Sequence, residues 1–414
     1  MKSYSKTLSL LLLILAGEAI FLLPFILIRV FRPIIREALI ITDLEIGKAQ
    51  AVYGITAMVS YVFGGVLADK WEPRKLISLS LIFTALGGIF MLQMPSFVGL
   101  QLLYGFWGVS TILLFWAALI KATRLWGNTD NQGLSFGLLD GGRGAFAALI
   151  ATFGAIIPSF VFPDDIDTVS LTHKISTLQY IIGFMTAIVV LIAVFVWIVL
   201  PDKTNNDSET SSKFDFSQIS QIIIKPKVFF HAIIIICAYS TYKVTDVYAI
   251  YAKDVWNYSI SKASEFGVIL QWVRPVAAIC IGWTADKFIT SKAILFCFVF
   301  IIFGYAAIGF GVFENQPEIF SLLTFLIISI GVYAMRGLYF ALIEEAKTPL
   351  SLTGTVIGLI SFLGYTPDIF MSLISGYILG DTPNIYNYQL LFKIVVWFPI
   401  IGFFATLGFR KYNQ

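Results

Sequence analysis

Charged residues are scarce in this chain: Asp, Glu, Lys and Arg make up only 13% of its 414 residues, about half the share found in soluble proteins. Cysteine and histidine are rarer still, with three and two copies. The cysteines lie in apolar runs, so we expect reduced packing residues and no disulfide framework. A net charge of +3 gives no reason to expect a nucleic-acid partner. The sequence shows no nucleophile–base pair and no metal-ligand cluster, so we expect no enzyme activity, no metal and no cofactor.

Apolar residues dominate instead, since 58% of the chain is hydrophobic and the mean hydropathy is +0.85. A helix needs roughly 20 apolar residues to cross the hydrocarbon core of a bilayer, and in lipid it satisfies its own backbone. No run alternates with period two, which argues against an outer-membrane barrel. We therefore predict an all-α integral membrane protein whose twelve transmembrane helices lie at 8–32, 45–69, 74–95, 97–124, 132–159, 176–200, 226–252, 262–286, 291–313, 317–345, 351–379 and 386–410.

The first segment begins like a secretory signal peptide, with Lys2 and Lys6 before an apolar run. The run continues to Ile28, which is long enough to span, so we predict a retained first helix. A polar stretch at 201–217 divides the helices six and six. The predicted organisation is an N-terminal six-helix bundle (1–200), a linker (201–225) and a C-terminal six-helix bundle (226–414).

Positive charges lie mostly in one set of loops, together with both termini, while the opposite loops carry mainly Asp and Glu. The positive-inside rule then predicts cytoplasmic N- and C-termini in a cell inner membrane. Arg32, Arg36 and Lys253 go against this bias without reversing it. We expect Arg29, Arg32 and Arg36 to lie near the outer surface with their charges reaching water.

Three pairs of segments repeat in the same order. Residues 64–75 (GGVLADKWEPRK) align with 281–292 (IGWTADKFITSK), 108–121 align with 331–344, and 132–137 align with 353–358. The offsets between partners are 217, 223 and 221 residues, as read from the printed sequence. We infer two homologous, pseudo-symmetric halves, an organisation typical of transporters that bind solute between their repeats.

The stretch GGVLADKWEPRK resembles the loop 2–3 signature of the major facilitator superfamily, matching it at Gly65, Asp69, Lys70, Arg74 and Lys75. The first copy departs from the pattern at Glu72. The second copy keeps Gly282, Asp286, Lys287 and Lys292 but has Ser291 in place of a cation. The resemblance implies the fold of that superfamily and a gate latch, in which Arg124 contacts Asp69 and Lys347 is the counterpart near Asp286. In the alternative reading, Lys70, Arg74 and Lys75 only fix topology. Gly65 is expected to let a neighbouring helix approach closely.

Ionisable residues inside the membrane are costly, so each one is a candidate for function. Arg336 and Arg274 have no acid within four residues, and a guanidinium suits a carboxylate or phosphate. We predict a substrate site made of Arg336, Arg274, Arg143, Lys243, Trp272 and Tyr339. The alternative is that the arginines form structural salt bridges between helices.

Four buried acids are candidates to carry a coupling proton: Asp140, Asp246, Asp368 and Glu18. Asp140 and Asp246 come first, because Arg143 and Lys243 each lie three residues away and can exchange with them. Coupling to sodium or to solute exchange stays open. Two glycine- or proline-containing stretches, 140–144 and 364–368, are expected to interrupt corresponding helices at a site or hinge.

The leading hypothesis is a proton-coupled secondary transporter that moves a small polar, anionic organic solute by alternating access. Residues 116–144 loosely resemble bacterial relatives of the organophosphate antiporters, which does not fix the substrate. A drug or metabolite exporter and a non-transporting solute receptor are the alternatives. We expect a monomer whose partners are the solute, the proton and the lipid bilayer.

Overall fold

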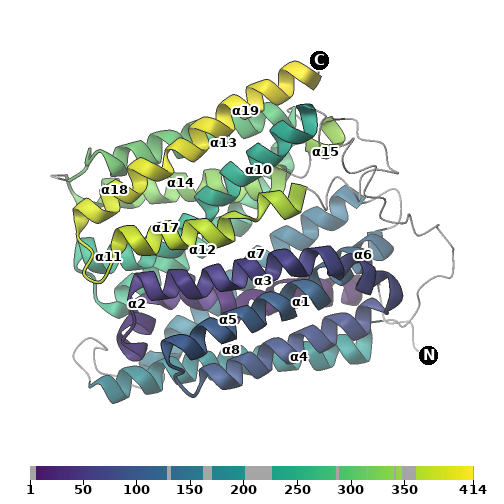
Figure 1. The fold of residues 1–414 in the computed structure, drawn as a ribbon, viewed down its shortest axis with the longest axis horizontal. Helices are drawn as coiled ribbons and strands as arrows, with labels where there is room; N and C mark the ends of the chain where they lie inside the picture. Colours follow the sequence, from purple (N-terminus) through teal and green to yellow (C-terminus); the bar gives the residue numbers. More distant parts are fainter. Residues whose placement is uncertain are drawn as a thin grey trace.

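The computed structural model describes residues 6–127, 132–161, 170–200, 226–285, 289–314, 316–339, 342–346 and 360–413. All elements in this part of the chain are helices (Figure 1). The first half contains α1 (Lys6–Phe21), η1 (Leu22–Ile26), α2 (Leu27–Leu39), α3 (Asp43–Lys70), α4 (Pro73–Met91), α5 (Phe97–Val109), η2 (Ser110–Trp116), α6 (Ala117–Gly127), α7 (Gln132–Val161) and α8 (Leu171–Val199).

The second half contains α10 (Pro226–Val244), η3 (Thr245–Val247), α11 (Tyr248–Trp256), α12 (Ile260–Ala285), α13 (Thr290–Gly309), α14 (Glu318–Leu338), α15 (Leu342–Glu345), α17 (Pro367–Leu379), α18 (Ile385–Val395) and α19 (Trp397–Asn413). Within the described residues, nine helical segments are long and apolar enough to cross a membrane. The long helices α3, α7 and α12 are not among those nine. Together these segments are consistent with the predicted twelve, and the prediction of an all-α membrane fold is confirmed.

Most predicted helix boundaries agree with the structure to within a few residues. A capping box fixes the start of α3, because the Thr42 side chain accepts from the Glu45 amide and the Glu45 carboxylate accepts from the Thr42 amide. The largest disagreements are in the tenth predicted helix, where α14 ends at Leu338 instead of residue 345, and in the first predicted helix. The first helix was predicted to end at residue 32, but α2 continues to Leu39 and carries two arginines into the protein interior.

Each half has a hydrophobic core, and Ile260 and Val268 of α12 in the second half pack into the core of the first. In Figure 1 the purple and blue half lies below the green and yellow half, with α3 and α17 side by side where they meet. We call the end where α2 ends and α3 begins the distal end, and the end where α1 begins and α19 ends the terminal end. The boundaries of the two domains stay a prediction, and the linker 201–225 lies outside the described residues.

The halves meet through helices that correspond in the repeat. α3 packs on α17 and α7 packs on α12, which pairs the second helix of one half with the fifth helix of the other, twice over. Glycines allow the α3–α17 approach. A Cβ on Gly47 would collide with the Ser372 carbonyl, and a Cβ on Gly54 would lie 2.9 Å from the backbone of Asp368 and Ile369.

Two expectations about glycines are wrong for this structure. A Cβ on Gly65 would meet no described atom within 4 Å, whereas its neighbour Gly64 lies against the carbonyls of Ile112 and Leu113. The stretch 140–144 does not interrupt its helix, because α7 runs unbroken from Gln132 to Val161. Its glycines instead make room for neighbouring side chains: Gly142 lies against Ile14 and Gly144 against Arg274. The break predicted at 364–368 is present, as a turn at residues 365–366 before α17.

Candidate functional site

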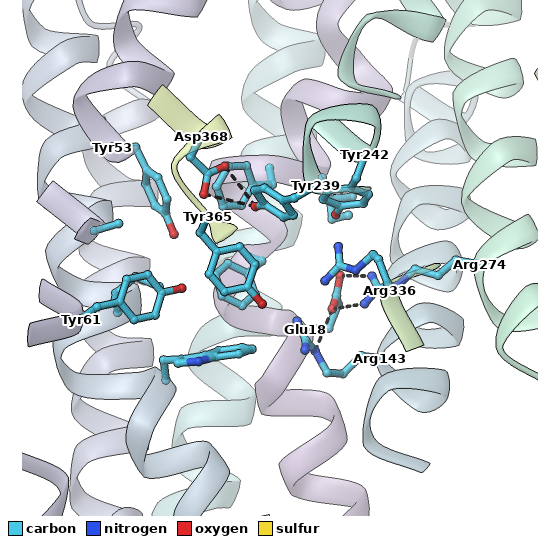
Figure 2. Close-up of a pocket in the computed structure, with 16 residues that line it drawn as sticks. Glu18, Tyr53, Tyr61, Arg143, Tyr239, Tyr242, Arg274, Arg336, Tyr365 and Asp368 are labelled. Atoms are coloured by element: carbon cyan, nitrogen blue, oxygen red, sulfur yellow. Dashed lines mark hydrogen bonds and ion pairs between the residues drawn. The ribbon is translucent and has the colours of Figure 1, made fainter. Parts of the chain in front are cut away.

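A cavity lies between the two halves, where several helices are irregular. The π-helical turns η1 and η2 interrupt the first and fourth transmembrane helices, and the 3₁₀ turn η3 interrupts the seventh. The cavity is about 50 Å³ in volume, room for only a few water molecules. It is lined by Glu18, Phe21, Phe25, Ile26, Tyr53, Ala57, Tyr61, Ile112, Trp116, Arg143, Tyr239, Tyr242, Arg274, Arg336, Tyr365 and Asp368 (Figure 2).

Glu18 lies between two arginines from different helices, as Figure 2 shows. Its carboxylate accepts from Arg143 Nε at 3.1 Å and from Arg274 at 2.8 and 3.4 Å. Asp140 lies beside the same arginines, 3.5 Å from Arg274 and 3.8 Å from Arg143. Because Glu18 and Arg143 belong to the first half and Arg274 to the second, this group joins the halves through charge-assisted hydrogen bonds.

Arg336 reaches the cavity from α14 and lies over the Tyr242 ring, 4.1 Å from its centroid. Among the residues that the structure describes, it makes no ion pair with an acid, and its Nε has no hydrogen-bond partner. A guanidinium without a counter-charge in such surroundings is costly. Arg336 therefore provides the cavity wall with a cation that has no acid within ion-pair distance among the described residues.

A second charged cluster lies beside the cavity. Arg29 donates to Asp246 at 2.6 Å and to the Tyr242 hydroxyl at 2.7 Å. Lys243 lies 3.0 Å from Asp246 and 3.4 Å from Asp368. The charges thus alternate from Arg29 through Asp246 and Lys243 to Asp368. The expectation that Arg29 lies near the outer surface is wrong, because its side chain is buried and bonded to the other half.

A third group closes the distal end and contains Arg36 and Glu37 of α2 with Lys253 and Asp254 of α11. We call these four residues the distal clasp. Arg36 contacts Asp254 at 3.0 Å, and Glu37 contacts Lys253 at 2.9 Å. Tyr388 also donates to Asp254, at 2.8 Å. Each pair joins one half to the other.

Arg32 differs from the expectation that its charge reaches water near the outer surface, whereas Arg36 lies at the distal end with a partly exposed side chain. Arg32 is buried with Asp43 at 2.6 Å. Arg36 contacts Asp43 at 3.2 Å as well as Asp254. Both side chains belong to α2, which continues to Leu39. Their ion pairs with Asp43 and Asp254 attach the end of α2 to α3 and α11.

The sequence model of the Major Facilitator Superfamily matches residues 10–372, which is most of the chain. The chain belongs to the Major Facilitator Superfamily. Two inner membrane proteins of Escherichia coli (strain K12) resemble it in sequence. YihN is 27% identical over 94% of this chain and 92% of that protein, and YqcE is 26% identical over 81% and 79%.

Solved structures of other superfamily transporters share its fold. A bacterial homolog of the human lysosomal transporter Spinster, inward-facing and unoccupied, has a TM-score of 0.72 at 16% identity and covers 99% of this chain and 98% of that chain. A D-xylose–proton symporter has a TM-score of 0.75 at 12% identity, with coverages of 98% and 97%. At these identities the likeness concerns the fold alone. Family and fold make this chain a secondary transporter.

The structure describes only part of the superfamily motif. Arg74 packs over the Trp197 ring at 5.1 Å, and Lys75 pairs with Glu72 at 3.1 Å, both inside the first half. Lys121 donates to the Ala68 carbonyl at 2.8 Å, which places a cation at the C-terminus of α3. The side chains of Asp69, Lys70 and Arg124, the surroundings of Gly282, and all of Asp286, Lys287 and Lys347 lie outside the described residues. The gate latch, in which Asp69 contacts Arg124 and Asp286 contacts Lys347, therefore stays a prediction.

The predicted substrate residues divide into two groups. Arg143, Arg274 and Arg336 line the cavity, and Lys243 lies next to it through Asp368. Trp272 and Tyr339 are not among the lining residues. Trp272 is 39% exposed and donates to Thr152 at the α7–α12 contact. Tyr339 is buried, and its carbonyl contacts His231 Nε2 at 2.6 Å.

The sequence reasoning missed Arg29 and the five cavity tyrosines, because tyrosine is common in this chain and Arg29 was placed near the surface. One signal was available for Arg29. It precedes Asp246 by 217 residues, the same offset that relates Asp69 to Asp286. The described part of this superfamily member holds no cluster of three or more potential metal ligands.

Proposed function

We propose that this protein transports a small organic anion across the inner membrane by alternating access, coupled to a proton. Arg336 is the observation that carries the proposal. A membrane protein that keeps a guanidinium in its central cavity without an acid partner holds a site for an anionic ligand. A carboxylate, phosphate or sulfonate would complete the ion pair with bidentate geometry.

The charge on the cavity wall supports the same ligand class. The wall carries three arginines, Arg143, Arg274 and Arg336, against two acids, Glu18 and Asp368. With the residues that pair with them, Asp140, Asp246, Arg29 and Lys243, the two charged clusters hold five cations and four acids, so one positive charge is left over for an anion to neutralise. A lipophilic cation, the typical cargo of many drug exporters, would add to this surplus.

The rest of the wall suits a small polar body attached to the anionic group. Five tyrosines offer hydroxyls for hydrogen bonds, and Phe21, Phe25 and Trp116 offer apolar surface. Because the cavity is nearly filled by these side chains, we expect them to move apart when solute enters. The interrupted helices η1, η2 and η3 are where such movement costs least.

The loop charges orient the protein with both termini in the cytoplasm. In that orientation the distal end is periplasmic, and the distal clasp closes the outer mouth of the cavity. The names of the two Escherichia coli relatives support an inner-membrane location.

The test begins with purified protein and a panel of organic phosphates, sulfonates, carboxylates, neutral sugars and peptides in a thermal-shift assay. We expect only anions to raise the melting temperature, since a ligand stabilises the state that it binds. Arg336→Gln should weaken that binding by about tenfold or more, because a hydrogen bond to a charged group contributes roughly 1.5–3 kcal/mol. Arg410→Gln, in the last turn of α19, removes the same charge away from the cavity as a control.

Counterflow in proteoliposomes then separates transport from binding alone. A transporter exchanges labelled solute against unlabelled solute inside, whereas a non-transporting receptor binds without exchange. Stabilisation by a neutral sugar that is unaffected by Arg336→Gln would contradict the proposed ligand class.

A further inference from the structure

We propose that Asp368 binds the coupling proton, and that Lys243 transfers its ion pair from Asp368 to Asp246 when the proton arrives. This inference rests on the proposed function and names the second ligand of the same site. The step is a proton transfer from a hydronium ion in the cavity to a carboxylate oxygen of Asp368, leaving water.

The other three central acids differ from Asp368 because each lies beside at least one arginine. Glu18 is held by Arg143 and Arg274, at distances down to 2.8 Å. Asp246 is held by Arg29 at 2.6 Å and also by Lys243. An arginine keeps its proton under all ordinary conditions, so an acid paired with one gains least from protonation. Asp140 likewise lies within 3.8 Å of two arginines.

Asp368 has no arginine within ion-pair distance in the described part of the chain. Its cationic partner is Lys243 at 3.4 Å, which lies closer to Asp246, at 3.0 Å. The same lysine therefore serves two carboxylates. When Asp368 is protonated, Lys243 can pair fully with Asp246, so neither charge is left without a partner.

Asp368 also lines the cavity, whereas Asp246 is not one of the lining residues. Its carboxylate oxygens accept from the Tyr239 hydroxyl at 3.1 and 3.2 Å, as drawn in Figure 2. The titratable and charged groups that surround it are Tyr239, Tyr242 and Lys243 of α10, Asp246 of η3, Tyr53 and Tyr61 of α3, and Tyr365 in the turn, with Glu18, Arg143, Arg274 and Arg336 across the cavity. The helix break at residues 365–366 presents Asp368 to this space.

Asp368 stands on the surface where the halves meet. A Cβ on Gly54 of α3 would lie 2.9 Å from the carbonyl carbon of Asp368. A change in the ion pairs of Asp368 therefore occurs at a contact that must separate when the distal end opens.

Proton and anion should favour each other at this site. Neutralising Asp368 raises the surplus positive charge of the cavity wall from one to two, which strengthens the attraction for an anion. The linkage is reciprocal, so a bound anion also favours the proton. This sign corresponds to proton–anion symport, with both ligands moving in the same direction.

The test is infrared difference spectroscopy of the full-length protein in lipid, titrated with acid in the absence of any transported solute. A protonated carboxylic acid has a carbonyl stretch that a carboxylate lacks and that moves in D₂O. We expect this band in the wild type, its loss in Asp368→Asn and its retention in Asp140→Asn and Asp246→Asn. Asp368→Glu should keep the band at a moved frequency, which covers the case in which the asparagine variant fails to fold.

A second arm tests the electrostatic link between the proton and the anion site. Arg336→Gln removes a nearby positive charge and should raise the midpoint of the acid titration by about half a pH unit or more, whereas Arg410→Gln should leave it unchanged. Persistence of the band in Asp368→Asn, or its absence from the wild type, would overturn the proton site. An unchanged midpoint in Arg336→Gln would overturn the link. Because no solute is used, these outcomes stay separate from a failure of the anion proposal.

Discussion

At the scale of single residues, Glu18 connects the two halves at the cavity. It is buried, and it balances one arginine from its own half and one from the other. A buried ion pair contributes little net stability, but removing one partner leaves a charge in a poor environment. Glu18 thus holds Arg143 of its own half and Arg274 of the other half in place beside the cavity.

We expect Glu18→Gln to lower the free energy of unfolding by about 3 kcal/mol, because two buried guanidiniums lose their closest counter-charge and keep only Asp140, at 3.5 and 3.8 Å. The double variant Glu18→Gln/Arg274→Gln should be more stable than the single one, since it removes one of the stranded charges. Melting temperatures in detergent, taken as a double-mutant cycle, measure the difference. Additive effects would show that the pair does not interact.

At the scale of helices, the α3–α17 crossing depends on residues without side chains. Gly47 and Gly54 of α3 face the backbone of α17, and Gly376 of α17 faces the backbone at Asp43. Backbone cannot move aside as a flexible side chain can. These glycines therefore decide how closely the two halves approach toward the distal end.

Gly47→Ala should separate α3 from α17, at a cost of about 1–3 kcal/mol in stability of the distal-closed form. Gly65→Ala is the matched control on the same helix, because its Cβ would enter open space in this conformation. Cysteine crosslinking between α3 and α17 reports the distance. Equal crosslinking in both variants would argue against a tight crossing.

At the scale of the whole molecule, the distal clasp has the symmetry of the repeat. The offset of 217 residues that relates Asp69 to Asp286 also relates Arg36 to Lys253 and Glu37 to Asp254. Each half therefore presents a basic residue followed by an acidic one. Arg36 contacts Asp254 and Glu37 contacts Lys253, so the two pairs are reciprocal, as in an isologous dimer interface.

Neutralising one side of the clasp, in Lys253→Gln/Asp254→Asn, should increase the population of distal-open molecules. Each partly exposed pair contributes up to about 1 kcal/mol, so we expect a shift of roughly 5- to 30-fold in the ratio of open to closed. The matched control Lys262→Gln/Glu265→Gln removes the same charges from exposed positions near the start of α12. Distances between spin labels at the distal end measure the populations, and an identical distribution in both double variants would show that the clasp does not hold the mouth shut.

The positions of the helices could be predicted from the sequence better than the ion pairs between them. Apolar runs located most of the described helices to within a few residues, because hydropathy depends only on neighbours along the chain. The same reasoning ended the first helix at residue 32 and expected the charges of Arg29, Arg32 and Arg36 to reach water, whereas all three form ion pairs. Their partners Asp43, Asp246 and Asp254 lie on other helices, so local patterns gave no sign of them.

By itself the sequence determined the membrane environment, the two matching halves and the family, since hydropathy, repeats and motifs are properties of the linear chain. Only the tertiary structure decided which charges neutralise one another, because Glu18, Asp246 and Asp368 each combine partners from helices far apart in sequence. It alone distinguished Arg336, which has no acid beside it among the described residues, from Arg274, which has two. The physical reason is that the energy of a buried charge depends on the few ångströms around it, and folding assembles those surroundings.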